Sequence, residues 1–116
     1  MLDQGQIQQK IEELYDRLET LTDEIRSAGA RAAEAEAAYE VSYAQERLRA
    51  RWEANENGVK LTVAQVEDIA TVATSELRLK ALLARNDLST LREAIGLAKT
   101  EMDGLRTLAA SNRVQV

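Results

Sequence analysis

The chain has 116 residues, with no proline, phenylalanine, histidine or cysteine, and a formal net charge of −5. The lack of histidine and cysteine removes the commonest general base, the thiol nucleophile, most transition-metal sites and any disulfide framework. Residues 1–36 hold nine acids and four bases, which accounts for the whole net charge, so a uniformly basic nucleic-acid-binding domain is excluded.

The length fits a single domain, and alanine, leucine, glutamate and arginine dominate the composition. Together with helical periodicity, this predicts an all-α fold, a long antiparallel helical hairpin or coiled coil. The glycines are isolated, so no glycine-rich phosphate loop is present. Carboxylate pairs such as Glu12 and Asp16 are interpreted as a solvated helix face. We therefore expect no enzymatic activity, no metal and no cofactor.

The first predicted arm, residues 4–54, opens on apolar residues in the four-three spacing of a coiled-coil seam. They are Ile7, Ile11, Leu14, Leu18, Leu21 and Ile25. Gly29 then interrupts the pattern, and glycine in a helix interior costs about 1 kcal/mol relative to alanine. We interpret this as a break or bend in the first arm.

The apolar pattern resumes after Gly29, but on a different face of the helix. The residues that carry it are Ala37, Val41, Ala44, Leu48 and Trp52. Continuing the first pattern by heptads would have used positions 39 and 46, so the second is displaced by two residues, about 200° around an ideal helix. Either the helix breaks near Gly29, or the two halves of the arm face different partners.

Turn chemistry clusters in residues 55–62, which we predict to be the tip of the hairpin. Asn57 and Gly58 tolerate a left-handed backbone and can end a helix. Thr62 and Gln65 have the spacing of a capping box that starts the next helix. An Asn-Gly β-hairpin turn is the alternative, but neither flank alternates with a period of two.

The second predicted arm, residues 63–111, carries the longest apolar stripe, and residues 112–116 are expected to fray. The stripe comprises Val66, Ala70, Ala73, Leu77, Ala81, Ala84, Leu88, Leu91, Ile95, Ala98, Met102, Leu105 and Ala109. The step from Leu77 to Ala81 is a stutter of the kind that locally unwinds a supercoil. The stripe passes through the polar residues 86–90 without interruption, which favours one continuous helix over a new helix capped at Thr90.

A second apolar stripe runs along the same arm, and one neighbouring helix cannot cover both. Its residues are Ile69, Val72, Leu79, Leu83, Leu97 and Leu108. Leaving such a side chain in water forgoes roughly 1.5–3 kcal/mol of burial. The sequence thus requires a third helix, from a break in the first arm or from another chain. We predict a homo-oligomer with this stripe as its interface.

Basic residues alternate before the single tryptophan, close to the predicted tip. Arg47, Arg51, Trp52 and Lys60 could contact single-stranded nucleic acid through phosphates and base stacking. In the alternative interpretation, neighbouring glutamates such as Glu46, Glu53, Glu56 and Glu76 neutralise the arginines, and Trp52 packs on the seam.

The chain resembles a loose group of small helical-hairpin proteins that tailed bacteriophages encode, often among recombination and replication genes. The likeness rests on residues 39–44 (Tyr-Glu-Val-Ser-Tyr-Ala) leading to 48–50, on 61–64 (Leu-Thr-Val-Ala), and on 102–108 (Met-Asp-Gly-Leu-Arg-Thr-Leu). It implies a phage origin and a supporting role, with no catalytic residues.

A second comparison is with the small secreted hairpins of the WXG type, which match in length and helicity. Here, however, Glu53 and Ala54 follow the tryptophan where that motif has glycine second, and the tail lacks the Tyr-x-x-x-Asp/Glu signal.

From the residues and the first resemblance, we expect a non-enzymatic phage accessory protein that acts by self-assembly and by binding a protein partner, in phage recombination or replication. The alternatives are single-stranded nucleic-acid binding by the tip, and a WXG-type or other structural coiled-coil protein. No apolar run could cross a bilayer and no signal peptide is apparent, so the expected location is the cytoplasm of a bacterial host, with no membrane partner.

Overall fold

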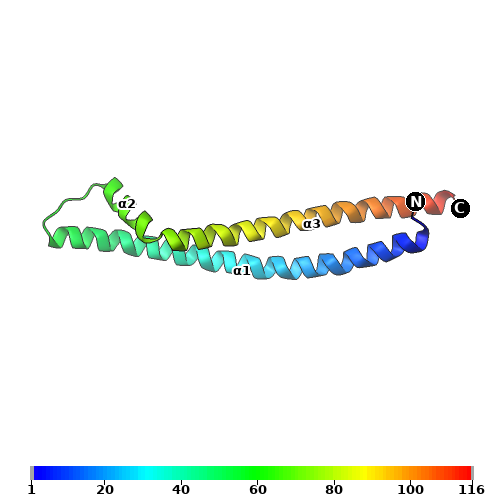
Figure 1. Ribbon diagram of the computed structural model, residues 1–116, viewed down its shortest axis with the longest axis horizontal. Helices are drawn as coiled ribbons and strands as arrows, with labels where there is room; N and C mark the ends of the chain where they lie inside the picture. The colour runs from blue at the N-terminus through cyan, green and yellow to red at the C-terminus, as the bar shows by residue number, and fades with distance from the viewer. Residues whose placement is uncertain (1, 116) are drawn as a thin grey trace. The chain divides into compact units, whose positions relative to one another are not determined.

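The computed structural model describes the backbone of residues 2–115 and the side chains of residues 2–113, all of it helical apart from short connections (Figure 1). The helices are α1 (Gln4–Glu56), α2 (Val63–Ala73) and α3 (Ser75–Gln115), and this part of the chain contains no strand. The all-α hairpin prediction is confirmed. Its contacts fall into two units, residues 1–28 with 87–116 (unit 1) and residues 29–86 (unit 2), which are described one at a time.

The predicted break near Gly29 is wrong, because α1 continues through this residue without interruption. The cost of one helical glycine, about 1 kcal/mol, is small against the helix propensity of the alanines around it, since alanine is the best helix former. The first arm is therefore one helix, and it cannot fold back to supply a third helix.

The predicted single helix of the second arm is also wrong, because it divides at Thr74 between α2 and α3. Thr74 leaves helical geometry with φ −109° and ψ 15°. Its buried hydroxyl donates to the carbonyl of Ala70 at 2.7 Å, a bond that competes with helix propagation and often bends helices. The carbonyl of Thr74 then accepts from the amide of Arg78, so α3 starts at once. Residues 86–90 are helical, as predicted, and α3 extends to Gln115, past the expected fraying point.

The tip forms as predicted. α1 ends at Glu56, and Gly58 adopts a left-handed φ of 66°. The amide of Gln65 donates to the Thr62 hydroxyl at 3.1 Å, and the amide of Thr62 donates to the Gln65 side chain at 2.9 Å, which completes the capping box. A similar exchange between Asp3 and Gln6 caps the start of α1, a signal that the sequence carried in its Asp-x-x-Gln spacing.

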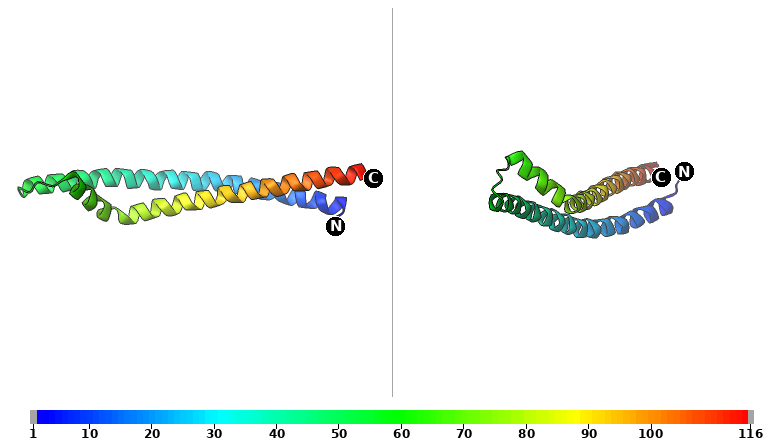
Figure 2. Two further views of the ribbon diagram at one scale, coloured as in Figure 1. Left: turned by 90° about the horizontal axis from the view of Figure 1, so that it is seen from above. Right: turned by 60° about the vertical axis from the view of Figure 1, so that its left-hand side comes forward.

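Unit 1 has a core of large side chains. The beginning of α1 and the end of α3 run side by side in opposite directions (Figures 1 and 2). Their buried residues are Ile7, Leu14, Leu21, Ala98, Met102, Leu105 and Ala109. These are members of the first seam of the first arm and of the long stripe of the second arm, so both patterns are buried here as predicted.

Unit 2 has a core of small side chains. The residues buried in it are Ala32, Ala50, Val66, Ala70, Thr74 and Ala81. Tyr39 and Glu46, on the heptad continuation of the first seam, are half-buried on the same inner side of α1. The buried residues of unit 2 are therefore mostly alanines, with Val66 and Thr74, while most of the larger apolar residues of this unit are exposed.

Replacing Thr62 with alanine should lower the free energy of unfolding by about 1 kcal/mol, because the N-cap acceptor for Gln65 is lost. Urea denaturation followed by circular dichroism at a fixed protein concentration measures the change. Thr71→Ala, at an exposed position inside α2, is the matched control and should be neutral or slightly stabilising. Equal losses in both variants would contradict a capping role for Thr62.

Candidate functional site

Exposed large apolar side chains gather in unit 2. Twelve such residues are exposed in the described part of the chain, and only Tyr15 and Leu97 belong to unit 1. The other ten are Val41, Leu48, Trp52, Val59, Val63, Ile69, Val72, Leu79, Leu82 and Leu83. Single exposed apolar residues are ordinary, but a concentration of them marks an interaction surface. Unit 2 is therefore the candidate functional region.

One part of this surface lies on α1 and is called here the α1 outer face. It consists of Ala37, Val41, Ala44, Leu48 and Trp52, all of which are exposed. Leu48 and Trp52 leave 66% and 65% of their surface uncovered. Because Ala50, Tyr39 and the other inward residues occupy the opposite side of the helix, the displaced apolar pattern points away from the hairpin. A helix break near Gly29 does not explain this displacement, because α1 is continuous. The two halves of the arm instead carry their large apolar residues on different faces of one helix.

A second part lies on α2 and α3 and is called the α2–α3 outer stripe. It consists of Ile69, Val72, Leu79 and Leu83, all exposed in unit 2 as the two-stripe pattern predicts. Asp68, Ile69, Val72 and Ala73 surround an open, almost wholly apolar hollow of about 480 Å³. The hollow is shallow and opens widely to solvent, so it offers an apolar surface and not an enclosed pocket.

Two residues assigned to the same interface lie in unit 1 and behave differently. Leu97 is exposed, as an interface residue should be before assembly. Leu108 is half-buried and packs against the core of unit 1, so less of it is exposed for an oligomer interface than the sequence pattern predicts. By its helical spacing, Leu108 lies next to the long apolar stripe of α3, and it packs against the core that this stripe forms with α1.

The basic residues before the tip are only partly neutralised. Arg49, which was not among the candidates, pairs with Glu46 at 3.4 Å and Glu53 at 3.5 Å. Arg47 and Arg51 make no ion pair within residues 2–113; Arg47 instead places its guanidinium 5.8 Å from the centre of the Tyr43 ring.

Trp52 is exposed, so the expectation that it packs on the seam is wrong. Lys60 is exposed in the connection between α1 and α2, and no contact in the described residues joins it to Arg47 or Arg51. Arg47 and Arg51 do come together, around a hollow on α1 that Ala44 and Leu48 complete. The structure thus gathers the arginines of the basic cluster on the α1 outer face, without Lys60.

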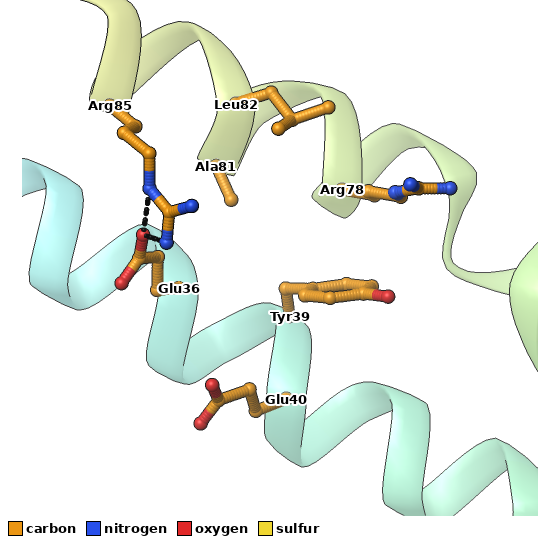
Figure 3. A pocket seen from close by; sticks show the side chains of 7 residues that line it. All are labelled: Glu36, Tyr39, Glu40, Arg78, Ala81, Leu82 and Arg85. Carbon is orange, nitrogen blue, oxygen red and sulfur yellow. Dashed lines mark hydrogen bonds and ion pairs between the residues drawn. The ribbon is translucent and has the colours of Figure 1, made fainter.

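A polar hollow on the inner side of unit 2 shows how its helices are joined. Figure 3 shows Arg85 of α3 reaching Glu36 of α1, and its Nε donates to a Glu36 carboxylate oxygen at 2.7 Å. The hollow measures about 140 Å³, below the size of ordinary small-molecule pockets, about 300–1,000 Å³. Since an exposed ion pair contributes at most about 1 kcal/mol, this contact links the helices without dominating their stability.

No group of three metal-ligating side chains gathers anywhere in residues 2–115. Over the same range, no helix combines the length and apolar content needed to span a bilayer. Comparison with protein-family models, curated proteins and solved structures finds no match to this chain. The outward apolar surface of unit 2 is therefore the feature from which a function has to be inferred.

Proposed function

We propose that this chain is a non-enzymatic assembly protein that acts by associating with itself and with a protein partner through the outward apolar surface of unit 2. The observation that carries this proposal is the reversal of burial in that unit. Its buried residues are mostly alanines, while Val41, Leu48, Trp52 and the α2–α3 outer stripe are exposed. Each such side chain forgoes roughly 1.5–3 kcal/mol that association recovers in part.

Two features of the surface fit association with other helices. The exposed residues repeat at helical spacing along α1, α2 and α3, which suits helix-in-groove or coiled-coil packing. The helices are already formed and capped in the protomer, so association does not bear the cost of ordering a disordered segment.

The resemblance to phage helical-hairpin proteins suggests the setting for this activity. In this proposal, the chain is a phage accessory protein that supports recombination or replication in the bacterial cytoplasm by holding a partner. Co-purification from infected cells, with wild-type protein against a variant of the α2–α3 outer stripe, tests it. A recombination or replication protein retained by the wild type and lost by the variant is the expected result.

Replacing Leu79 and Leu83 together with glutamate should lower the mass of the assembly in solution, because two charges would have to be desolvated in an apolar contact. Both side chains are more than half exposed, so helix content should stay unchanged. Light scattering at micromolar concentration gives the mass, and circular dichroism gives the helicity.

The matched control introduces two glutamates at the exposed polar positions Lys80 and Asn86 of the same helix. It should keep the wild-type mass. A wild-type protein that is monomeric at micromolar concentration would contradict self-association, and an unchanged mass in the Leu79 and Leu83 variant would remove the α2–α3 outer stripe from the interface.

The exposure of Trp52 favours a second candidate function, binding of single-stranded nucleic acid near the tip. An uncovered indole beside the unpaired Arg51 can stack on a base while the guanidinium contacts phosphate. The nearby glutamates, Glu53 and Glu56, weaken such a site, so it ranks second.

If the tip binds single strands, affinity for a labelled oligonucleotide should fall steeply with salt, because phosphate contacts release counterions. Trp52→Ala should then cost roughly 1–3 kcal/mol of binding free energy. Lys60→Glu should weaken binding, whereas Lys99→Glu, an equal charge change on an exposed site of unit 1, should not. Absence of any salt-sensitive shift at low salt would leave protein association as the function of this region.

A further inference from the structure

The sizes and charges of the side chains along the α1 outer face indicate which kind of molecule packs on it. We propose that a second copy of the chain packs on this face, with the two α1 helices antiparallel over residues 34–52. This inference rests on the proposed self-association and adds a second contact surface to it, apart from the α2–α3 outer stripe, together with the orientation and register of that contact. The whole range lies in one continuous helix of unit 2.

The register follows from matching large side chains to small ones. In an antiparallel pair, placing Val41 opposite Ala44 of the second copy brings Leu48 opposite Ala37 of the second copy. Symmetry repeats both contacts, so each large residue of the face meets an alanine. Alternation of large and small residues across a seam lets helices interlock without voids. The same alternation would leave gaps between the alanines if each residue faced its own copy.

The charges of the face fit the same register. One heptad step beyond the apolar layers, Glu34 lies opposite Arg51 of the second copy. Beside the layers, Glu40 and Arg47 of the second copy occupy the flanking positions that face each other in an antiparallel coiled coil. Symmetry doubles both contacts, so four oppositely charged pairs would border four apolar layers.

None of these four charged side chains forms a salt bridge within residues 2–113. The salt bridges of Arg49 with Glu46 and Glu53, and of Arg85 with Glu36, do not include them. Glu34, Glu40 and Arg51 are exposed. Arg47 is half-buried, with its guanidinium over the Tyr43 ring and its buried Nε without a hydrogen-bond partner in that range.

A parallel pair of α1 helices would not bring opposite charges together. In register, Glu34 would face Glu34 of the second copy and Arg51 would face Arg51. The flanking positions would bring Glu40 beside Gln45 and Arg47 beside Trp52, with no opposite charges. Because flanking charges set orientation in coiled coils, the pattern selects the antiparallel arrangement.

Cysteine crosslinking tests the orientation, since the natural chain contains no cysteine. In the antiparallel dimer the two copies of residue 37 lie about 16 Å apart along the helix axis, from the rise of 1.5 Å per residue. A disulfide bridges Cα atoms less than about 7 Å apart. Ala37→Cys alone should therefore form no disulfide dimer, whereas an equimolar mixture with Leu48→Cys should form one under mild oxidation.

Charge reversal tests the register without introducing a crosslink. Glu40→Arg and Arg47→Glu should each raise the dissociation constant of the dimer about tenfold or more, because both symmetry-related pairs become repulsive. Mixing the two variants should restore wild-type affinity, since the mixed dimer contains one natural pair and one reversed pair. Glu101→Arg, an equal charge change on exposed α3 of unit 1, is the control and should change nothing. Analytical ultracentrifugation measures the constants, and circular dichroism checks that helicity is retained.

The outcomes separate this inference from the proposed function. The antiparallel dimer is overturned if Ala37→Cys crosslinks with itself, or if mixing the charge variants does not restore affinity. Self-association is still supported in that case if the wild type is oligomeric. A wild type that stays monomeric overturns both. Crosslinking only in the mixture, together with restored affinity, supports the proposed dimer.

Discussion

The large apolar side chains of α1 change from one face of the helix to the other along its length. This change determines which of them are buried in the protomer. Up to Leu21 these residues lie on the side of α1 that packs in the core of unit 1. From Val41 onward they lie on the opposite side, and the side of α1 toward the other helices of unit 2 carries Ala32, Tyr39, Glu46 and Ala50. A continuous helix cannot rotate its faces to bury both sets, so Val41, Leu48 and Trp52 remain exposed in the protomer.

The outer residues stay exposed because α1 is continuous. A break at Gly29 would have allowed the second half to turn and bury Val41, Leu48 and Trp52 within the protomer. The alanines around the glycine keep the backbone helical, and the apolar face is left outward. The one real break, at Thr74, lies in the returning arm and is stabilised by a buried hydroxyl bonded to Ala70. It separates α2 from α3 without hiding Val72 or Leu79.

The polar groups of the chain support an architecture more readily than a chemical reaction. The capping box at Thr62 starts α2, and the pair between Arg85 and Glu36 links two helices of unit 2. Glu40 and Arg47 form no salt bridge in the described residues, and Arg47 lies over the Tyr43 ring.

The sequence by itself determined the helices, the tip and the stripe of the second arm that packs in unit 1, because periodicity, turn residues and caps act over a few neighbouring positions. It also marked Ile69 and Leu83 as apolar residues that one neighbouring helix could not cover. Three features follow only from the tertiary structure: α1 passes Gly29 unbroken, the returning arm divides at Thr74, and Trp52 is exposed to solvent. Those outcomes depend on competition between a small local cost and the packing of distant residues, and on which side of a helix its neighbour occupies. Neither quantity is contained in the spacing of residues along one chain.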